Sequence, residues 1–166
     1  MKIKINRTTP ITQQLAQAGI GFAPREGSPL PPDAGLKIVD EDSRSVSLEE
    51  INLNDIVFNL YLGMDHLCDG DERIEYLKKR TKKLVRLDAG IGMELIRNAN
   101  SIPLTWGRDE NNDPVTFFFC DGTIFSEDDG NKYVLQILRD LDSGVWEANL
   151  CHLSEDSETP TAVLEK

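Results

Sequence analysis

The sequence lacks the long apolar runs that membrane proteins need. Its longest apolar stretches are residues 56–58 and 117–120, whereas a helix that spans a bilayer needs about 20 mainly apolar residues. The basic residues within 1–7 are not followed by an apolar run, as they would be in a signal peptide. We therefore predict a cytoplasmic protein that has no contact with a membrane.

Cysteine and histidine are scarce. The chain has three cysteines, Cys68, Cys120 and Cys151, and two histidines, His66 and His152. Widely separated cysteines of odd number, without an export signal, indicate reduced thiols rather than a disulfide framework. The spacing of these residues is not that of a zinc site, and two adjacent residues on a strand point to opposite faces. We predict no metal and no cofactor.

Common catalytic motifs are also absent. The sequence has no Gly-x-Ser-x-Gly elbow and no glycine-rich phosphate loop. Residues 109–113 offer oxygen ligands at alternating positions, but Pro114 and Cys120 stand where a calcium loop requires glycine and glutamate. We predict a protein that is not an enzyme. A small thiol- or metal-dependent enzyme that combines one of the cysteines with a histidine stays the alternative, because such residues meet only in the fold.

Positive charge is in short supply. Lysine and arginine number 18 against 29 aspartates and glutamates, which gives a net charge of -11. A surface of this sign repels nucleic acids and attracts basic proteins. The acids gather in segments separated by other sequence: 40–42, 69–72, 109–113, 127–129 and 155–158. If these segments converge on one side of the protein, they imitate the charge of a nucleic-acid backbone.

The length of 166 residues suits one domain with a substantial core. Residues 24–35 contain four prolines and two glycines, which are incompatible with a regular helix or a central strand. We therefore divide the chain into an N-terminal strand, helix and proline-rich arm (1–35), a main domain (36–153) and an acidic flexible tail (154–166).

Hydrophobic periodicity predicts the elements. Helices of period 3.6 are expected over 53–67, 72–87, 91–99 and 133–141, and the first of these would be the core helix. Strands are expected at 2–6, 36–39, 104–106, 115–120, 123–125 and 145–150, with Asp121 and Gly122 as a hairpin turn. The order predicts an α+β fold: a helical cluster followed by an antiparallel hairpin or small sheet, with a packed C-terminal helix.

The charge and the lack of catalytic motifs together favour a small binding protein. We predict an inhibitor, of the immunity or counter-defence type, that docks on a basic surface of a nuclease, a toxin or another nucleic-acid-binding protein. Trp106 would be an aromatic anchor at the interface or, alternatively, a core residue. The predicted contact acids are Asp109, Glu110, Asp113, Asp128 and Asp129.

A basic stretch on the predicted second helix supports a further alternative. Its cations could bind a phosphate backbone, although a solvated helix face is the commoner role for such a stretch. Acids at 109–113 carry the wrong charge for a neighbouring DNA contact. The residues of this alternative nucleic-acid site are Lys78, Lys79, Lys82, Lys83 and Arg86.

Overall fold

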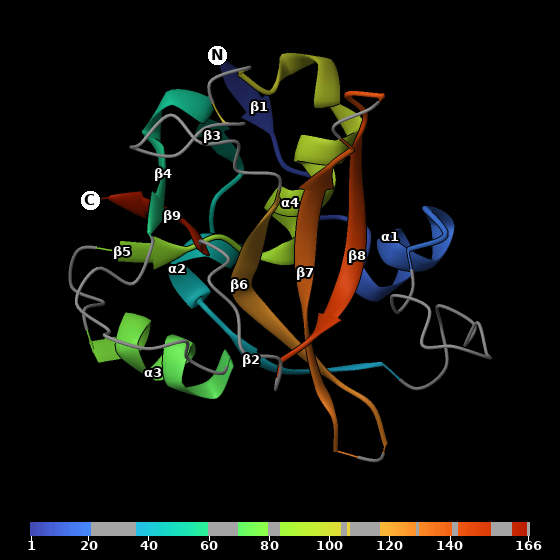
Figure 1. Cartoon of the computed structure of the whole chain (residues 1–166), viewed down its shortest axis with the longest axis vertical. Coiled ribbons are helices and arrows are strands. Elements are labelled where there is room, and N and C mark those ends of the chain that lie inside the picture. The colour runs from blue at the N-terminus through green and yellow to red at the C-terminus, as the bar shows by residue number, and fades with distance from the viewer. Residues whose placement is uncertain are drawn as a thin grey trace.

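The fold is known from a computed structural model. It describes residues 1–20, 36–59, 70–79, 84–103, 106, 117–128, 130–140, 143–153 and 161–165. These residues form nine strands, four α-helices and two 3₁₀ helices (Figure 1). In chain order the elements are β1 (Lys2–Lys4), α1 (Ile11–Gln17), β2 (Lys37–Glu41), α2 (Ser43–Val46), β3 (Glu50–Asn52), η1 (Leu53–Asp55), β4 (Ile56–Asn59), α3 (Gly70–Lys79), β5 (Leu84–Arg86), α4 (Ala89–Arg97), η2 (Ala99–Ser101), β6 (Phe117–Ser126), β7 (Lys132–Arg139), β8 (Trp146–His152) and β9 (Thr161–Glu165).

A mixed sheet of seven strands organises the molecule. Its main path runs β4-β9-β6-β7-β8, while β2 also pairs with β6 and β5 also pairs with β9. The pairs are antiparallel except for β6 and β9, which meet in parallel at Phe119 and Thr161. A separate two-stranded sheet joins β1 to β3. Strand β6 therefore touches three other strands and forms the centre of the fold.

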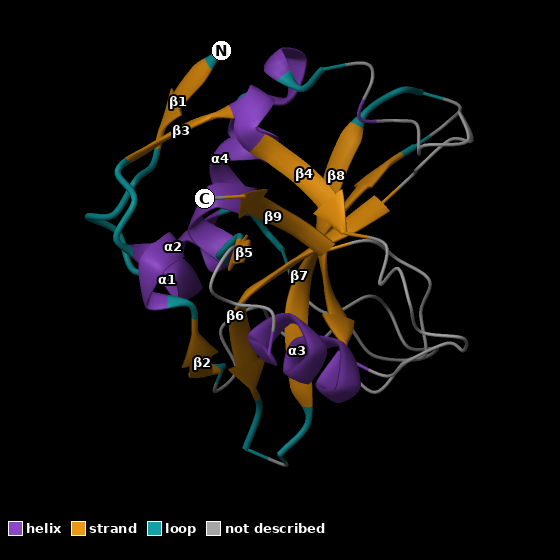
Figure 2. Ribbon diagram, turned by 90° about the vertical axis from the view of Figure 1, so that its left-hand side faces the viewer, coloured by secondary structure: helices purple, strands orange, loops and turns teal. Residues whose placement is uncertain are grey.

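The two faces of the sheet carry different helices. The helices α1, α2 and α4 lie on one side of β6 and β7 (Figure 2). The main core on that side joins α4 to alternate buried residues of the sheet, among them Phe118, Cys120, Leu135, Ile137, Ala148 and Leu150. A smaller core on the other side joins Ile74 of α3 to Phe119, Ile124, Val134 and Leu153. β6 and β7 are thus buried on both faces, whereas β8 is buried on one.

The predicted fold class is wrong. The structure is mainly sheet with short helices, not a helical cluster followed by a hairpin. The predicted core helix over 53–67 is replaced, as far as residue 59, by η1 and β4. Ile56 is buried, Val57 is exposed and Phe58 is half-buried, which is the alternation of a strand. β-branched and aromatic side chains favour this pleated surface.

The predicted C-terminal helix over 133–141 is also wrong, because residues 133–139 lie in β7. β7 runs between β6 and β8, and its side chains from Tyr133 to Leu135 are all buried. A central strand covered on both faces has an almost continuous apolar sequence, which also satisfies the spacing of a helix. The local pattern could not distinguish the two.

Some local predictions are confirmed with shifted bounds. The strands expected at 2–6, 36–39 and 145–150 are β1, β2 and β8, and the helix expected at 91–99 is α4. The helix expected at 72–87 ends at Lys79 and is followed by β5. The expected strand at 104–106 is tested only at Trp106, which is helical, and the acidic loop at 107–114 lies outside the described residues.

Both chain ends belong to the folded body where the structure describes them. Ile3, Ile5 and Leu15 enter the main core, and β9, within the segment expected to be a flexible tail, pairs with three other strands. Residues 21–35 and 154–160, which adjoin the two predicted boundaries, lie outside the described residues. The division into three segments stays a prediction.

Asp121 and Gly122 do not form the predicted hairpin turn. They lie inside β6, where the pairing with β7 shifts register between Cys120 and Ile124. The Gly122 N–H donates to Leu87 O at 2.7 Å, and the Gly122 carbonyl accepts from the Asp42 N–H at 2.8 Å. Glycine is needed here because three backbones meet at one point.

Replacing Gly122 with alanine should destabilise the fold. A Cβ atom at this position would lie 2.4 Å from Arg86 O and 2.6 Å from Asp88 N, and backbone atoms cannot rotate away. We expect Gly122→Ala to lower the free energy of unfolding by about 1–3 kcal/mol in urea titrations. Lys4→Ala, which changes an exposed side chain of β1, is the control and should stay within about 0.5 kcal/mol of the parent. Equal stability of parent and Gly122→Ala would contradict this packing.

Candidate functional site

Exposed ion pairs tie α3, β2 and the β6–β7 hairpin together at the lower end of the molecule (Figure 1). Each pair joins two of these elements: Lys78–Asp40 and Lys132–Asp71, both with 2.8 Å between nitrogen and oxygen, and Lys37–Asp128 at 2.6 Å. The described parts of three acidic segments, residues 40–42, 71–72 and 127–128, are therefore neighbours in space. We name the exposed and half-buried carboxylates of this region the acidic end: Asp40, Asp71, Glu72, Glu75, Glu127 and Asp128.

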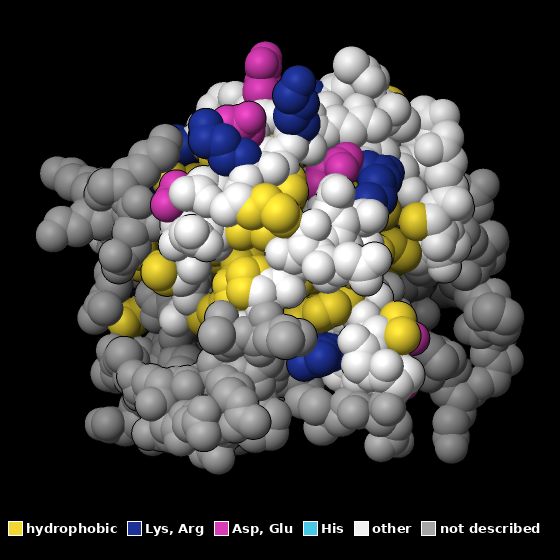
Figure 3. Space-filling model, turned by 90° about the horizontal axis from the view of Figure 1, so that it is seen from above, with side chains coloured by type: hydrophobic (Ala, Val, Ile, Leu, Met, Phe, Trp, Pro, Cys, Tyr) yellow, Lys and Arg dark blue, Asp and Glu magenta, His cyan; other side chains and the backbone are white. Residues whose placement is uncertain are grey.

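The positive charge of the described residues is largely neutralised within the molecule. Five of the six described lysines form ion pairs with carboxylates: Lys2, Lys37, Lys78, Lys79 and Lys132. Five of the six described arginines do the same: Arg7, Arg44, Arg73, Arg86 and Arg97. On the face shown in Figure 3, most lysine and arginine side chains lie beside aspartates or glutamates. The described residues therefore form no basic patch on the surface.

The described residues of the predicted basic helix face, Lys78, Lys79 and Arg86, do not form one exposed surface. Lys78 pairs with Asp40, and Lys79 pairs with Glu75 at 3.2 Å. Arg86 lies on β5 rather than on the helix, and only 3% of it is exposed, which corrects its predicted place on the surface. Its guanidinium donates to the Asp121 carbonyl at 2.8 Å and to Asp40. Lys82 and Lys83 lie outside the described residues.

A buried charge network lies directly beneath the acidic end. Arg73 of α3, 1% exposed, donates to both carboxylate oxygens of Asp121 at 3.0 Å, and its guanidinium lies 4.2 Å from the centre of the Phe119 ring. The Thr161 hydroxyl of β9 donates to the same carboxylate. The network therefore fixes α3 and β9 to β6, and it positions the acids of α3.

Asp42 joins β2 to β5 beside this network. Burial raises the pKa of the Asp42 carboxyl, but hydrogen bonds from the Arg44 guanidinium and the Arg86 backbone N–H outweigh burial and hold the pKa below the ordinary value. The carboxyl is thus ionised at neutral pH, although it is 6% exposed.

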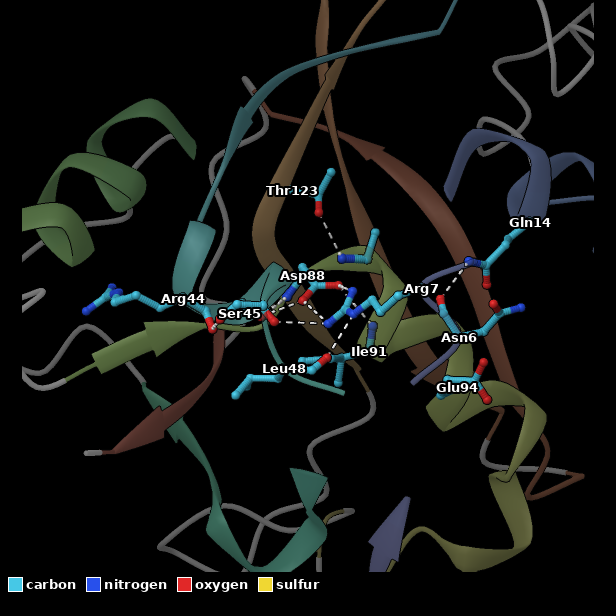
Figure 4. A network of polar contacts seen from close by, with 12 residues as sticks. Asn6, Arg7, Gln14, Arg44, Ser45, Leu48, Asp88, Ile91, Glu94 and Thr123 are labelled. Carbon is cyan, nitrogen blue, oxygen red and sulfur yellow. Dashed lines mark hydrogen bonds and ion pairs between the residues drawn. The ribbon is translucent and has the colours of Figure 1, made fainter. Parts of the chain in front are cut away.

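A second buried network holds the N-terminal segment (Figure 4). The Arg7 guanidinium donates to the two carboxylate oxygens of Asp88 at 2.7 and 2.9 Å and also to the backbone carbonyls of Ser45 and Leu48. The Ser45 hydroxyl donates to Asp88 at 2.6 Å, and Asp88 caps α4 by accepting from the Ile91 N–H. Ser45 is fully buried, so this serine–aspartate pair serves the fold and does not face a substrate.

The described thiols and imidazole do not form a catalytic pair. Cys120 is fully buried, and burial, reinforced by the charges of Asp88 and Asp121, raises the pKa of its thiol well above the ordinary value. The thiol of half-buried Cys151 donates to the His152 backbone carbonyl of the same strand at 3.8 Å. The His152 ring contacts Asn131 and Tyr133. Cys68 and His66 lie outside the described residues.

Within the described part of the chain, no cluster of three or more His, Cys, Asp or Glu side chains could hold a metal ion. The same residues include no helix that is long and apolar enough to cross a membrane.

The predicted contact residues have different positions. Asp128 is exposed and belongs to the acidic end, whereas Asp109, Glu110, Asp113 and Asp129 lie outside the described residues. Trp106 is 7% exposed and packs edge-on against Phe58 and Phe118, with ring centres 5.3 and 6.1 Å apart. It is thus a core residue, and its burial removes it from the predicted interface.

Sequence reasoning missed the residues that build the buried networks: Arg7, Arg73, Asp88 and Asp121. One local signal was available, because Asp88 stands directly before an apolar helical stretch, where aspartate is a favoured N-cap. Arg73 has no such signal, since its partner lies 48 residues away on another element.

Comparison with known protein families, with curated proteins and with solved structures finds no match for this chain.

Breaking the buried pair should cost far more stability than breaking an exposed one. Asp121→Asn leaves the Arg73 charge buried without its carboxylate, and we expect a loss of about 3–5 kcal/mol in the free energy of unfolding, measured in urea. Asp128→Asn removes the exposed Lys37 pair and should leave the unfolding midpoint unchanged. Similar midpoints for the two variants would show that Arg73 is not buried against Asp121.

Cys120 should be unreactive in the native protein. Iodoacetamide attacks the thiolate, which burial suppresses, so we expect Cys120 to stay unmodified at pH 7.5 and to react fully in urea. Mass spectrometry of peptides after timed labelling measures both, with half-buried Cys151 as the internal comparison. Labelling of Cys120 as fast in native protein as in urea would contradict its place in the core.

Proposed function

We propose that this protein is a non-catalytic binding module of the cytoplasm that docks on a basic surface of another protein. The partner class is a nuclease, a toxin or another nucleic-acid-binding protein, and the effect of binding is inhibition. An inhibitor of this kind occupies the cations that would otherwise hold phosphates, so it competes with the nucleic acid.

The observation that carries the proposal is the internal pairing of the positive charge. Nearly all described lysines and arginines already have carboxylate partners, while the chain keeps a net charge of -11. Each pair neutralises a carboxylate as well as a cation, so the negative charge that a partner meets is the excess of 29 acids over 18 bases in the whole chain. This charge favours a basic protein and opposes nucleic acid.

The acidic end is the surface on which we place the contact. Its carboxylates come from three elements that the ion pairs and the Arg73–Asp121 network hold in place, so the charges are arranged before a partner arrives. A rigid surface loses less conformational entropy on binding than a mobile one. Asp109, Glu110, Asp113 and Asp129 are proposed to add to this surface.

The test compares two charge-reversed variants. Glu72→Lys with Asp128→Lys alters the acidic end, and Glu49→Lys with Asp55→Lys alters the distant β3–η1 region by the same charge (Figure 1). The tagged parent chain first captures proteins from host lysate at low salt, and each captured basic protein is then purified. Association rates with the three chains are measured against salt concentration.

We expect the acidic-end variant to associate about tenfold more slowly at low salt and with a weaker salt dependence, because electrostatic steering is lost. The β3–η1 variant should resemble the parent. When the parent chain is added to the purified partner with a nucleic acid already bound, the nucleic acid should be displaced. Equal slowing by both variants, or no basic protein captured at low salt, would refute the proposal.

A further inference from the structure

Two aliphatic side chains are exposed next to each other on β2. Ile38 is 41% exposed and Val39 is 55% exposed. The other exposed large apolar side chains among the described residues, Met1, Val57 and Val145, are separated from one another in the chain. β2 lies on the outer side of β6 (Figure 2) and, among the described strands, pairs only with β6. We name Ile38 and Val39 the β2 apolar pair.

The register of β2 explains this exposure. The pairing with consecutive residues of β6 passes from Ile38 directly to Asp40. Val39 is therefore the extra residue of a β-bulge and has no partner on β6. A bulge interrupts the alternation that points every second side chain of a strand toward the core. The two aliphatic side chains are accordingly exposed in succession.

An exposed ion pair lies on each side of the bulge. Lys37 pairs with Asp128 of the β6–β7 hairpin, and Asp40 pairs with Lys78 of α3. The β2 apolar pair lies between Lys37 and Asp40 in the chain, so it belongs to the same region as the acidic end. This region therefore presents apolar surface as well as carboxylates, on a strand that is tied to two other elements.

The combination resembles the anatomy of a protein interface, in which an apolar centre is covered by the partner and a polar rim stays in contact with water. Exposed ion pairs contribute little affinity. Apolar surface contributes more, because its removal from water is favourable. The β2 apolar pair can thus supply a short-range attraction that the carboxylates lack.

We propose that the β2 apolar pair is the centre of the surface that docks on the basic partner. The complementary site on the partner is a patch of apolar side chains bordered by lysines or arginines. Its cations lie near Asp40 and Asp128 when its apolar side chains cover the β2 apolar pair. This inference rests on the proposed function, because it assigns a short-range contact to the same surface.

A second copy of this chain is the less suitable occupant. It would bring two chains of net charge -11 together at their acidic ends. Charge complementarity therefore favours a basic partner over self-association.

The first test uses the full chain and two capped synthetic peptides of equal charge, Lys-Lys-Leu-Val-Leu-Lys-Lys and Lys-Lys-Ser-Thr-Ser-Lys-Lys. NMR follows isotope-labelled isoleucine and valine methyl groups during titration. The apolar peptide should shift the methyl resonances of Ile38 and Val39 and bind about threefold more tightly than the polar one. The methyl resonances of Val145, which is 52% exposed and lies outside the acidic end, should not shift.

The second test uses a basic protein captured on the parent chain. Ile38→Thr with Val39→Thr removes apolar surface but keeps β-branched side chains, which favour a strand. We expect this double variant to dissociate about tenfold faster, with an unchanged association rate and salt dependence. Reversal of the acids, by contrast, should slow association.

Two further variants complete this test. Val145→Thr makes the same change at an exposed aliphatic residue outside the acidic end and should dissociate like the parent. Val39→Thr alone alters only the residue without a partner on β6, so the fold is kept, and dissociation should be about threefold faster. Urea midpoints of all variants check that each chain is folded.

Three results would overturn the inference. Equal affinity of the two peptides, without shifts at Ile38 and Val39, would show that the surface acts by charge alone. Methyl shifts that appear without peptide and grow with protein concentration would assign the β2 apolar pair to a second copy. A captured basic protein that leaves the double variant no faster than the parent, while reversal of the acids still slows association, would keep the proposed function and remove the β2 apolar pair from it.

Discussion

The structure depends on one buried interaction, the pair between Arg73 and Asp121. Charges with almost no exposure are tolerated only when they are paired and fully hydrogen-bonded. Asp121 meets this condition through Arg73 and Thr161, and its backbone carbonyl accepts from Arg86. A single residue of the central strand thus fixes a helix and two other strands. Since α3 carries part of the acidic end, the arrangement of surface charge follows from this buried contact.

The same principle explains the positions of the lysine and arginine side chains. Arg73 and Arg86 are buried and Arg7 is half-buried. A guanidinium tolerates such places because it can satisfy several acceptors at once, as Arg7 does with Asp88 and two backbone carbonyls. Lysines lie at the surface in pairs with carboxylates that belong to neighbouring elements. An acidic chain that uses its scarce cations for internal contacts presents an acidic exterior. Composition and fold therefore both support the proposed basic partner.

Local sequence could predict some elements and not others, for identifiable reasons. β1, β8 and α4 have patterns that only one structure satisfies, and Asp88 adds a capping signal. β7 has an apolar sequence that fits a helix equally well, and only its place between β6 and β8 makes it a strand. Gly122 resembled a turn residue because the sequence cannot show that Leu87 and Asp42 approach it. The acidic segments are visible in the sequence, but Arg73 and Asp121 could not be paired without the fold.

In the proposed function, the carboxylates of the acidic end act before contact. Their charge acts over a distance of about a Debye length, roughly 8–10 Å at ordinary salt, so it raises the rate of encounter but selects only the sign of the partner's charge. A basic protein that makes no further contact would therefore be attracted and then released, so the retention of one partner has to come from short-range contacts.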